Sequence, residues 1–156
     1  MWKIFKMSPQ QNFLYEKAKN FCDYQERCIF DVKSKLLQWK ASGNTIKSII
    51  QRLEREDFIN EERYAVAFAT GKLRNNKWGK NKIYYALSQK HIPDIYIQMG
   101  LNEIDEKEYL DTLKTLIKSK KINETDDFKR NAKMLSFCRQ KGYQPSLVWK
   151  VINGEL

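Results

Sequence analysis

The same succession of helix-ending and helix-starting residues occurs three times along the chain, and this repetition constrains the fold more than any other feature. Each copy has a lysine in the last turn of a helix, a residue suited to a left-handed cap, a helix starter and then a short apolar helix. The copies lie at 36–53, 83–101 and 134–152. A further helix precedes each copy, at about 12–25, 61–75 and 105–121. We therefore expect nine helices arranged as three units of three.

The residues expected at the left-handed caps are spaced by 48 and 51 positions, which suits a helical repeat. These residues are Gly43, His91 and Gly142, and the helix starters that follow them are Thr45, Pro93 and Pro145. Many helices end in Lys-Gly, so coincidence is the alternative, but three complete triplets argue against it. His91 is the only histidine. Without a second histidine or a Ser, Asp or Cys grouping near it, we expect a cap residue rather than a general base or metal ligand.

Apolar residues recur at helical spacing, as in Ile46, Ile49, Ile50 and Leu53, and strand-like alternation is almost absent. The chain has only three prolines and six glycines, which fits helices with short connections. The expected fold class is all-α.

The composition narrows the kinds of partner and compartment. A net charge of +10 favours an anionic partner, either nucleic acid or an acidic protein surface, although a merely soluble basic protein would show the same excess. Three cysteines without C-x-x-C spacing and a single histidine make a zinc site improbable and suit free thiols in a reducing cytoplasm. No apolar run exceeds five residues and the start does not resemble a secretory signal, so we expect a cytoplasmic protein that does not enter a membrane.

The segment 73–87, LRNNKWGKNKIYYAL, concentrates positive charge where a helix begins. Between Glu62 and Asp94 the chain has seven Lys or Arg residues and no Asp or Glu. Cations in a first helical turn oppose the positive end of the helix dipole, at about 0.3–1 kcal/mol each when exposed. The unpaired backbone N–H groups of that turn already form an anion seat, which added lysines would strengthen. We therefore expect a binding site for carboxylates or phosphates at Lys72, Arg74, Lys77, Trp78, Gly79, Lys80 and Lys82.

Other interpretations of this segment remain open. Acidic residues of the preceding unit could neutralise the lysines through tertiary packing, with Glu54, Glu56 and Asp57 as candidates. Trp78 could stack on a base or enter a partner's pocket, or it could cover the local core. A second basic patch ends the seventh helix, where cations are expected, and is weaker evidence for a site. It consists of Lys114, Lys118, Lys120 and Lys121.

The segment 54–93 contains a set of residues in a specific order and spacing, namely Phe58, Ile59, Glu61, Arg63, Tyr64, Ala65, Phe68, Gly79, Lys82, Ile83, Leu87 and Lys90. In this order and spacing the segment resembles the central signature of the RecX family of regulatory proteins, which modulate the RecA recombinase. By spacing, we expect Ala65, Phe68, Ile83 and Leu87 in the core. We expect Arg63 to pair with an internal acid rather than to contact a partner. Two positions depart from the common pattern: Glu61 replaces Asp, which makes Asn60 the better helix cap, and His91 replaces Gly.

The resemblance implies three tandem three-helix units in an elongated, curved helical array. The boundaries that we expect are an N-terminal tail at 1–11 and units at 12–57, 58–104 and 105–156. The resemblance also implies a monomeric, non-enzymatic regulator of DNA repair that needs no cofactor. Such a regulator binds the RecA–single-stranded DNA filament and inhibits its ATPase, its strand exchange and hence recombination.

Two functions from other classes are the alternatives. A helical-repeat module could bind nucleic acid directly, with an affinity that falls steeply with salt; weak direct DNA binding could also accompany filament binding. An enzyme is disfavoured, because the sequence has no glycine-rich phosphate loop, no metal-ligand spacing and no pairing of a nucleophile with a base.

Overall fold

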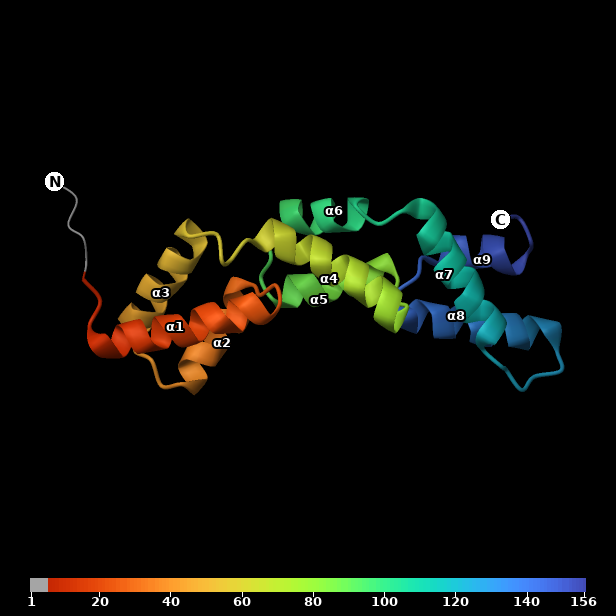
Figure 1. Ribbon diagram of the computed structural model, residues 1–156. Helices are drawn as coiled ribbons and strands as arrows, with labels where there is room; N and C mark the ends of the chain where they lie inside the picture. Colours follow the sequence, from red (N-terminus) through yellow and green to blue (C-terminus); the bar gives the residue numbers. More distant parts are fainter. Residues whose placement is uncertain (1–5) are drawn as a thin grey trace. The chain divides into compact units, whose positions relative to one another are not determined.

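The computed structural model describes residues 6–156, and this part of the chain is all-helical, with nine α-helices and no strand (Figure 1). The predicted fold class and its three-helix repeats are confirmed. The helices are α1 (Pro9–Tyr24), α2 (Ile29–Gln38), α3 (Gly43–Arg55), α4 (Glu61–Asn76), α5 (Lys80–Gln89), α6 (Asp94–Asn102), α7 (Glu106–Ser119), α8 (Asp127–Lys141) and α9 (Pro145–Ile152).

The first helix begins three residues earlier than the sequence predicts. Ser8 caps α1 through a capping box: its hydroxyl accepts from the Gln11 N–H at 3.2 Å, and the Gln11 side chain accepts from the Ser8 N–H at 3.0 Å. Pro9 suits the first helical position, where no backbone donor is needed. Residues 9–11 of the expected tail at 1–11 therefore belong to α1, and residues 1–5 of that tail lie outside the described part.

The helix ends repeat with a more regular period than the sequence suggested. The left-handed residues after α2, α5 and α8 are Lys40, His91 and Gly142, with φ of 63°, 57° and 100°. Their spacing is 51 residues in both intervals. The prediction for His91 and Gly142 is thus confirmed, and that for Gly43 is wrong. Gly43 instead opens α3 and follows its N-cap Ser42, whose hydroxyl accepts from the Thr45 N–H at 3.3 Å.

The same period holds in the core. Leu36, Leu87 and Cys138 occupy equivalent places, and none of the three exposes any surface. In each three-helix repeat the carbonyl of this residue accepts a hydrogen bond from the backbone N–H five positions later, at 3.0, 3.3 and 3.0 Å, which closes the helix end. Equivalent positions in the third helices, Ile46, Ile97 and Val148, are buried as well. The cap geometry and the buried apolar side chains are therefore features of one repeated unit.

Leu87→Ala should lower the free energy of unfolding by about 2–5 kcal/mol, because it removes a fully buried side chain and leaves a cavity. Urea denaturation measures this loss. Leu37, which is 57% exposed on α2, provides the matched control, and Leu37→Ala should change stability by no more than about 0.5 kcal/mol. A loss below about 1 kcal/mol for Leu87→Ala would contradict its place in the core.

The chain divides into two compact units, the first ending at Tyr64 and the second running from Ala65 to Leu156. In the first unit, α1, α2 and α3 pack against one another around a core that includes Ala18, Val32, Leu36, Ile49 and Leu53.

Two predictions about residues near the end of the first unit, Asn60 and Arg63, are confirmed. The Asn60 side chain accepts from the Arg63 N–H at 3.0 Å, and the Arg63 guanidinium pairs with Glu26 at 2.5 Å and Asp57 at 3.1 Å.

In the second unit, the beginning of α5 meets the end of α8. The Gly79 N–H donates to the Lys141 carbonyl at 2.7 Å, and the Asn81 N–H donates to the Gly142 carbonyl at 2.9 Å. The Lys80 N–H donates to the Tyr109 hydroxyl at 3.0 Å. The prediction that the first turn of α5 has unpaired N–H groups that could bind an anion is therefore wrong for these three residues. The carbonyl end of α8, which is the negative end of its dipole, already lies against the first turn of α5.

Candidate functional site

Trp78 is the centre of a surface on which cations gather around aromatic rings. The Nζ atoms of Lys72 and Lys82 lie 4.8 and 4.6 Å from the Trp78 ring centroid. Phe68 meets the same indole edge to face, with ring centroids 6.4 Å apart. Lys90 Nζ lies 5.8 Å from the Phe68 ring. We call this set, Phe68, Lys72, Trp78, Lys82 and Lys90, the tryptophan face.

The end of α4 positions the tryptophan face. Lys77 adopts a left-handed φ of 56°, and the Trp78 N–H donates back to the Lys72 carbonyl at 3.1 Å. This return brings the indole against α4, where Phe68 and Lys72 follow one another at i, i+4. The Tyr143 hydroxyl donates to the Lys77 carbonyl at 3.0 Å and so holds the turn from the third three-helix repeat. Burial raises the pKa of Tyr143, which keeps this hydroxyl protonated.

Two lysines of the tryptophan face, Lys72 and Lys82, carry charge that no carboxylate of the described residues neutralises. Within residues 6–156, neither Lys72 nor Lys82 forms an ion pair with a carboxylate. Both side chains are half-buried beside the ring rather than fully extended into solvent. Two ammonium groups near one indole repel each other, and an anion placed between them would be attracted by both.

Two of the predicted site residues are instead paired within the protein. Arg74 donates to both carboxylate oxygens of Glu108, at 2.7 and 3.2 Å, and Lys80 Nζ lies 2.8 Å from Glu106. Hydrogen bonding from Arg74 lowers the pKa of the Glu108 carboxyl. The acids come from α7, in the following repeat. Of the acids suggested in the preceding repeat, Glu56 is bound to Arg52 and Asp57 to Arg63.

Gly79 and the second basic patch lie outside the tryptophan face. Gly79 is the N-cap of α5 and is buried against α8, so it is a structural residue. Of the second basic patch, Lys114 and Lys118 lie on α7, Lys120 is its C-cap and Lys121 follows it. Lys120 Nζ lies 4.5 Å from the Phe137 ring, and none of the four lysines forms an ion pair in the described part of the chain.

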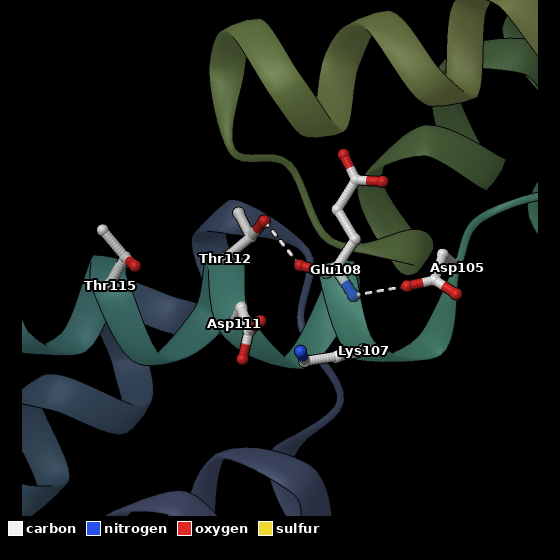
Figure 2. Close-up of a pocket in the computed structure, with 6 residues that line it drawn as sticks. All are labelled: Asp105, Lys107, Glu108, Asp111, Thr112 and Thr115. Atoms are coloured by element: carbon white, nitrogen blue, oxygen red, sulfur yellow. Dashed lines mark hydrogen bonds between the residues drawn. The ribbon is translucent and has the colours of Figure 1, made fainter.

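A shallow pocket on α7 has polar lining residues that mainly stabilise the helix itself. These residues are Asp105, Lys107, Glu108, Asp111, Thr112 and Thr115 (Figure 2). The Glu108 N–H donates to Asp105 at 2.9 Å and the Thr112 hydroxyl to the Glu108 carbonyl at 2.7 Å, both serving the helix itself. In Figure 2 the Glu108 side chain extends from α7 toward α4, where Arg74 binds it.

Among the described residues, no group of three or more His, Cys, Asp or Glu could hold a metal ion, and no helix is long and apolar enough to span a membrane.

One member of the tryptophan face was assigned incorrectly from the sequence. Phe68 was expected in the core by spacing, but it is only half-buried and packs at the surface against Trp78 and Lys72. Ala65, Ile83 and Leu87, the other three, are fully buried as predicted. The signal for Phe68 was available in the sequence, because a cation four residues later on a helix lies over the same face.

Comparison with known proteins gives the family. A family model described as "RecX, second three-helix domain" matches residues 60–101, which contain the whole tryptophan face. The regulatory protein RecX of Clostridium perfringens (strain 13 / Type A) is 31% identical over 133 residues, 80% of this chain. That of Clostridium acetobutylicum is 28% identical over 151 residues, 92% of this chain. The chain belongs to the RecX family. Both of these relatives are named regulatory proteins.

The RecX fold is also recognisable in solved structures. The crystal structure of RecX from Lactobacillus salivarius superposes with a TM-score of 0.81 over 95% of this chain and 97% of that one, at 22% identity. This likeness shows the fold. The chain spans 62% of the length of the C. perfringens relative and 70% of the C. acetobutylicum one. The activity and partners of the whole RecX proteins are therefore proposals for this chain.

Proposed function

We propose that this RecX-family chain binds the RecA–single-stranded DNA filament in the cytoplasm and inhibits its ATP hydrolysis and strand exchange. It acts as a monomer, without chemistry or a cofactor of its own, and thereby limits recombination and regulates DNA repair. The observation that carries the proposal is the tryptophan face, where Lys72 and Lys82 lie within 5 Å of the Trp78 ring and no carboxylate of the described part of the chain pairs with either. The bound anion is a carboxylate or phosphate of the filament.

The distribution of charge supports this choice of surface. Residues 65–156 contain 17 Lys or Arg and 10 Asp or Glu, whereas residues 1–64 contain 12 and 9. Most of the excess charge therefore belongs to the second unit, the same unit that contains the tryptophan face. Such an excess attracts an anionic polymer over the distance of the Debye length and raises the rate of encounter.

A second candidate function is direct binding of nucleic acid without a recombinase. The feature in its favour is again Trp78, because an indole flanked by cations is a common platform for an unpaired base. The two functions differ in salt dependence and in the need for the recombinase. Direct binding should weaken steeply with salt, with a slope that grows by about 0.7 for each phosphate contact on a single strand.

Substoichiometric amounts of the chain should slow ATP hydrolysis by RecA assembled on single-stranded DNA, while the chain alone hydrolyses no ATP. The measurement is the steady-state ATPase rate of preformed filaments during titration with the protein. An unchanged rate at a stoichiometric amount would remove the main support for filament regulation. If free single-stranded DNA were bound as tightly as the filament, direct nucleic-acid binding would replace it.

A further inference from the structure

Two contacts of the tryptophan face recur in the first three-helix repeat with the roles of cation and ring exchanged. Positions 17 and 39 are equivalent to positions 68 and 90, given the 51-residue period. In the first repeat Lys17 Nζ lies 4.2 Å from the Trp39 ring, and in the second Lys90 Nζ lies 5.8 Å from the Phe68 ring. The same two backbone positions therefore hold a cation against an aromatic ring in both repeats, with the residue types reversed.

The second contact shows the same exchange. Positions 21 and 27 are equivalent to positions 72 and 78. The Arg27 guanidinium carbon lies 3.8 Å from the Phe21 ring, and Lys72 Nζ lies 4.8 Å from the Trp78 ring. If these contacts served only packing, the cation and the aromatic residue would not both have to change position between the two repeats. The repeated pairing indicates a repeated surface chemistry, in which cations lie beside exposed π-faces.

The first repeat extends this chemistry along α1. Phe13, Lys17, Phe21 and Tyr24 follow at i, i+4, i+8 and i+11, which places them along one side of the helix. Phe13 is 64% exposed and Tyr24 is 83% exposed, although large aromatic side chains favour burial. We call this set the α1 seam, and it consists of Phe13, Lys17, Phe21, Tyr24, Arg27 and Trp39.

Among residues 6–156, no carboxylate forms an ion pair with Lys17 or Arg27, although Glu16 and Asp23 lie on the same helix as Lys17. Glu26, which immediately precedes Arg27, is bound to Arg63 at 2.5 Å. Asp31 hydrogen-bonds with Tyr64. Arg27 itself donates to the Phe21 carbonyl at 3.1 Å, which fixes the guanidinium over the Phe21 ring and leaves its other donors for an anion.

We propose that the α1 seam is a binding site for single-stranded nucleic acid, with bases stacked on Phe13 and Tyr24 and phosphates held by Lys17 and Arg27. Exposed rings on α1, with Lys17 between them and Arg27 just after the helix, match the two demands of an unpaired strand, stacking faces and positive charge for its backbone. An acidic protein surface would use the cations but would leave Phe13 and Tyr24 without a role. This site requires no recombinase and is additional to the tryptophan face.

The test is the affinity of the whole chain for fluorescein-labelled oligo(dT), measured by fluorescence anisotropy at low salt without recombinase. The double variant Phe13→Ala, Tyr24→Ala should raise the Kd at least about fivefold, because each base stacked on an aromatic side chain contributes on this scale. Lys17→Gln should reduce the salt slope of log Kd by about 0.7. Phe128 is 78% exposed on α8, outside both surfaces, so Phe128→Ala should leave the Kd unchanged.

Several results would overturn the proposal. They are a wild-type chain that does not bind oligo(dT), a double variant that binds it normally, and an equal loss in Phe128→Ala. Circular dichroism melting of each variant establishes that the fold is retained, which the exposure of the replaced rings leads us to expect. If the double variant kept its oligo(dT) affinity but no longer inhibited the filament, the α1 seam would contact protein and the proposal would be wrong. Because oligo(dT) binding needs no recombinase, its outcome is separate from that of the filament ATPase test.

Discussion

Gly142→Ala is expected to lower the free energy of unfolding by about 2–5 kcal/mol. Gly142 has a φ of +100°, and a Cβ atom there would lie 2.4 Å from the Lys82 Cβ and 2.6 Å from the Lys82 N. A left-handed conformation costs an L-residue about 1–2 kcal/mol, and forcing extra atoms into a packed contact costs about 1–3 kcal/mol. The backbone of α5 cannot move aside without breaking its hydrogen bonds to the end of α8.

Gly71→Ala is the matched control for this substitution. Gly71 lies inside α4, where the nearest atom to a new Cβ is 4.0 Å away, so alanine should raise stability by up to about 1 kcal/mol. Urea denaturation of both variants gives the comparison. A Gly142→Ala protein within about 0.5 kcal/mol of the wild type would show that the close approach of α5 and α8 is absent in solution.

The parts of the fold that depend on local sequence could be predicted. Asn60 and Pro145 act within one turn of themselves, and each takes the role at a helix start that the sequence predicts. Lys40 could not be identified in the same way. Its left-handed φ lies at the end of α2, whereas the nearby Gly43, which lacks a Cβ atom and so tolerates positive φ more readily, is used to start α3 instead.

The candidate site could be predicted only in outline, because its distinctions come from distant residues. The sequence located the basic segment but did not show that Arg74 and Lys80 pair with acids 34 and 26 residues later. It also did not show that the first turn of α5 donates to the end of α8. These contacts distinguish the basic residues that bind acids within the protein, Arg74 and Lys80, from Lys72 and Lys82, which lie beside the Trp78 ring. The contacts depend on packing between repeats, which no local sequence pattern encodes.

Lys72→Glu combined with Lys82→Glu is expected to raise the concentration of protein that half-inhibits the filament by at least about tenfold. Each change places a carboxylate where a carboxylate or phosphate of the filament is proposed to bind, and like charges brought together at an interface cost several kcal/mol. Stability should fall by no more than about 1 kcal/mol per site, because each lysine loses its contact with the Trp78 ring but breaks no ion pair.

Lys107→Glu combined with Lys129→Glu is the control for net charge. It makes the same change in charge within the second unit, at two exposed lysines outside the tryptophan face. Any loss that follows from overall charge alone should appear equally in both double variants. A loss confined to the Lys72 and Lys82 variant would be specific to the tryptophan face.

The most direct test is therefore the steady-state ATPase rate of RecA filaments on single-stranded DNA, titrated in parallel with the wild-type chain and the two double variants. The proposed function predicts inhibition by the wild type and by the Lys107 and Lys129 variant, and little inhibition by the Lys72 and Lys82 variant. Equal inhibition by all three proteins would contradict the role of the tryptophan face. No inhibition by the wild-type chain would contradict filament regulation itself.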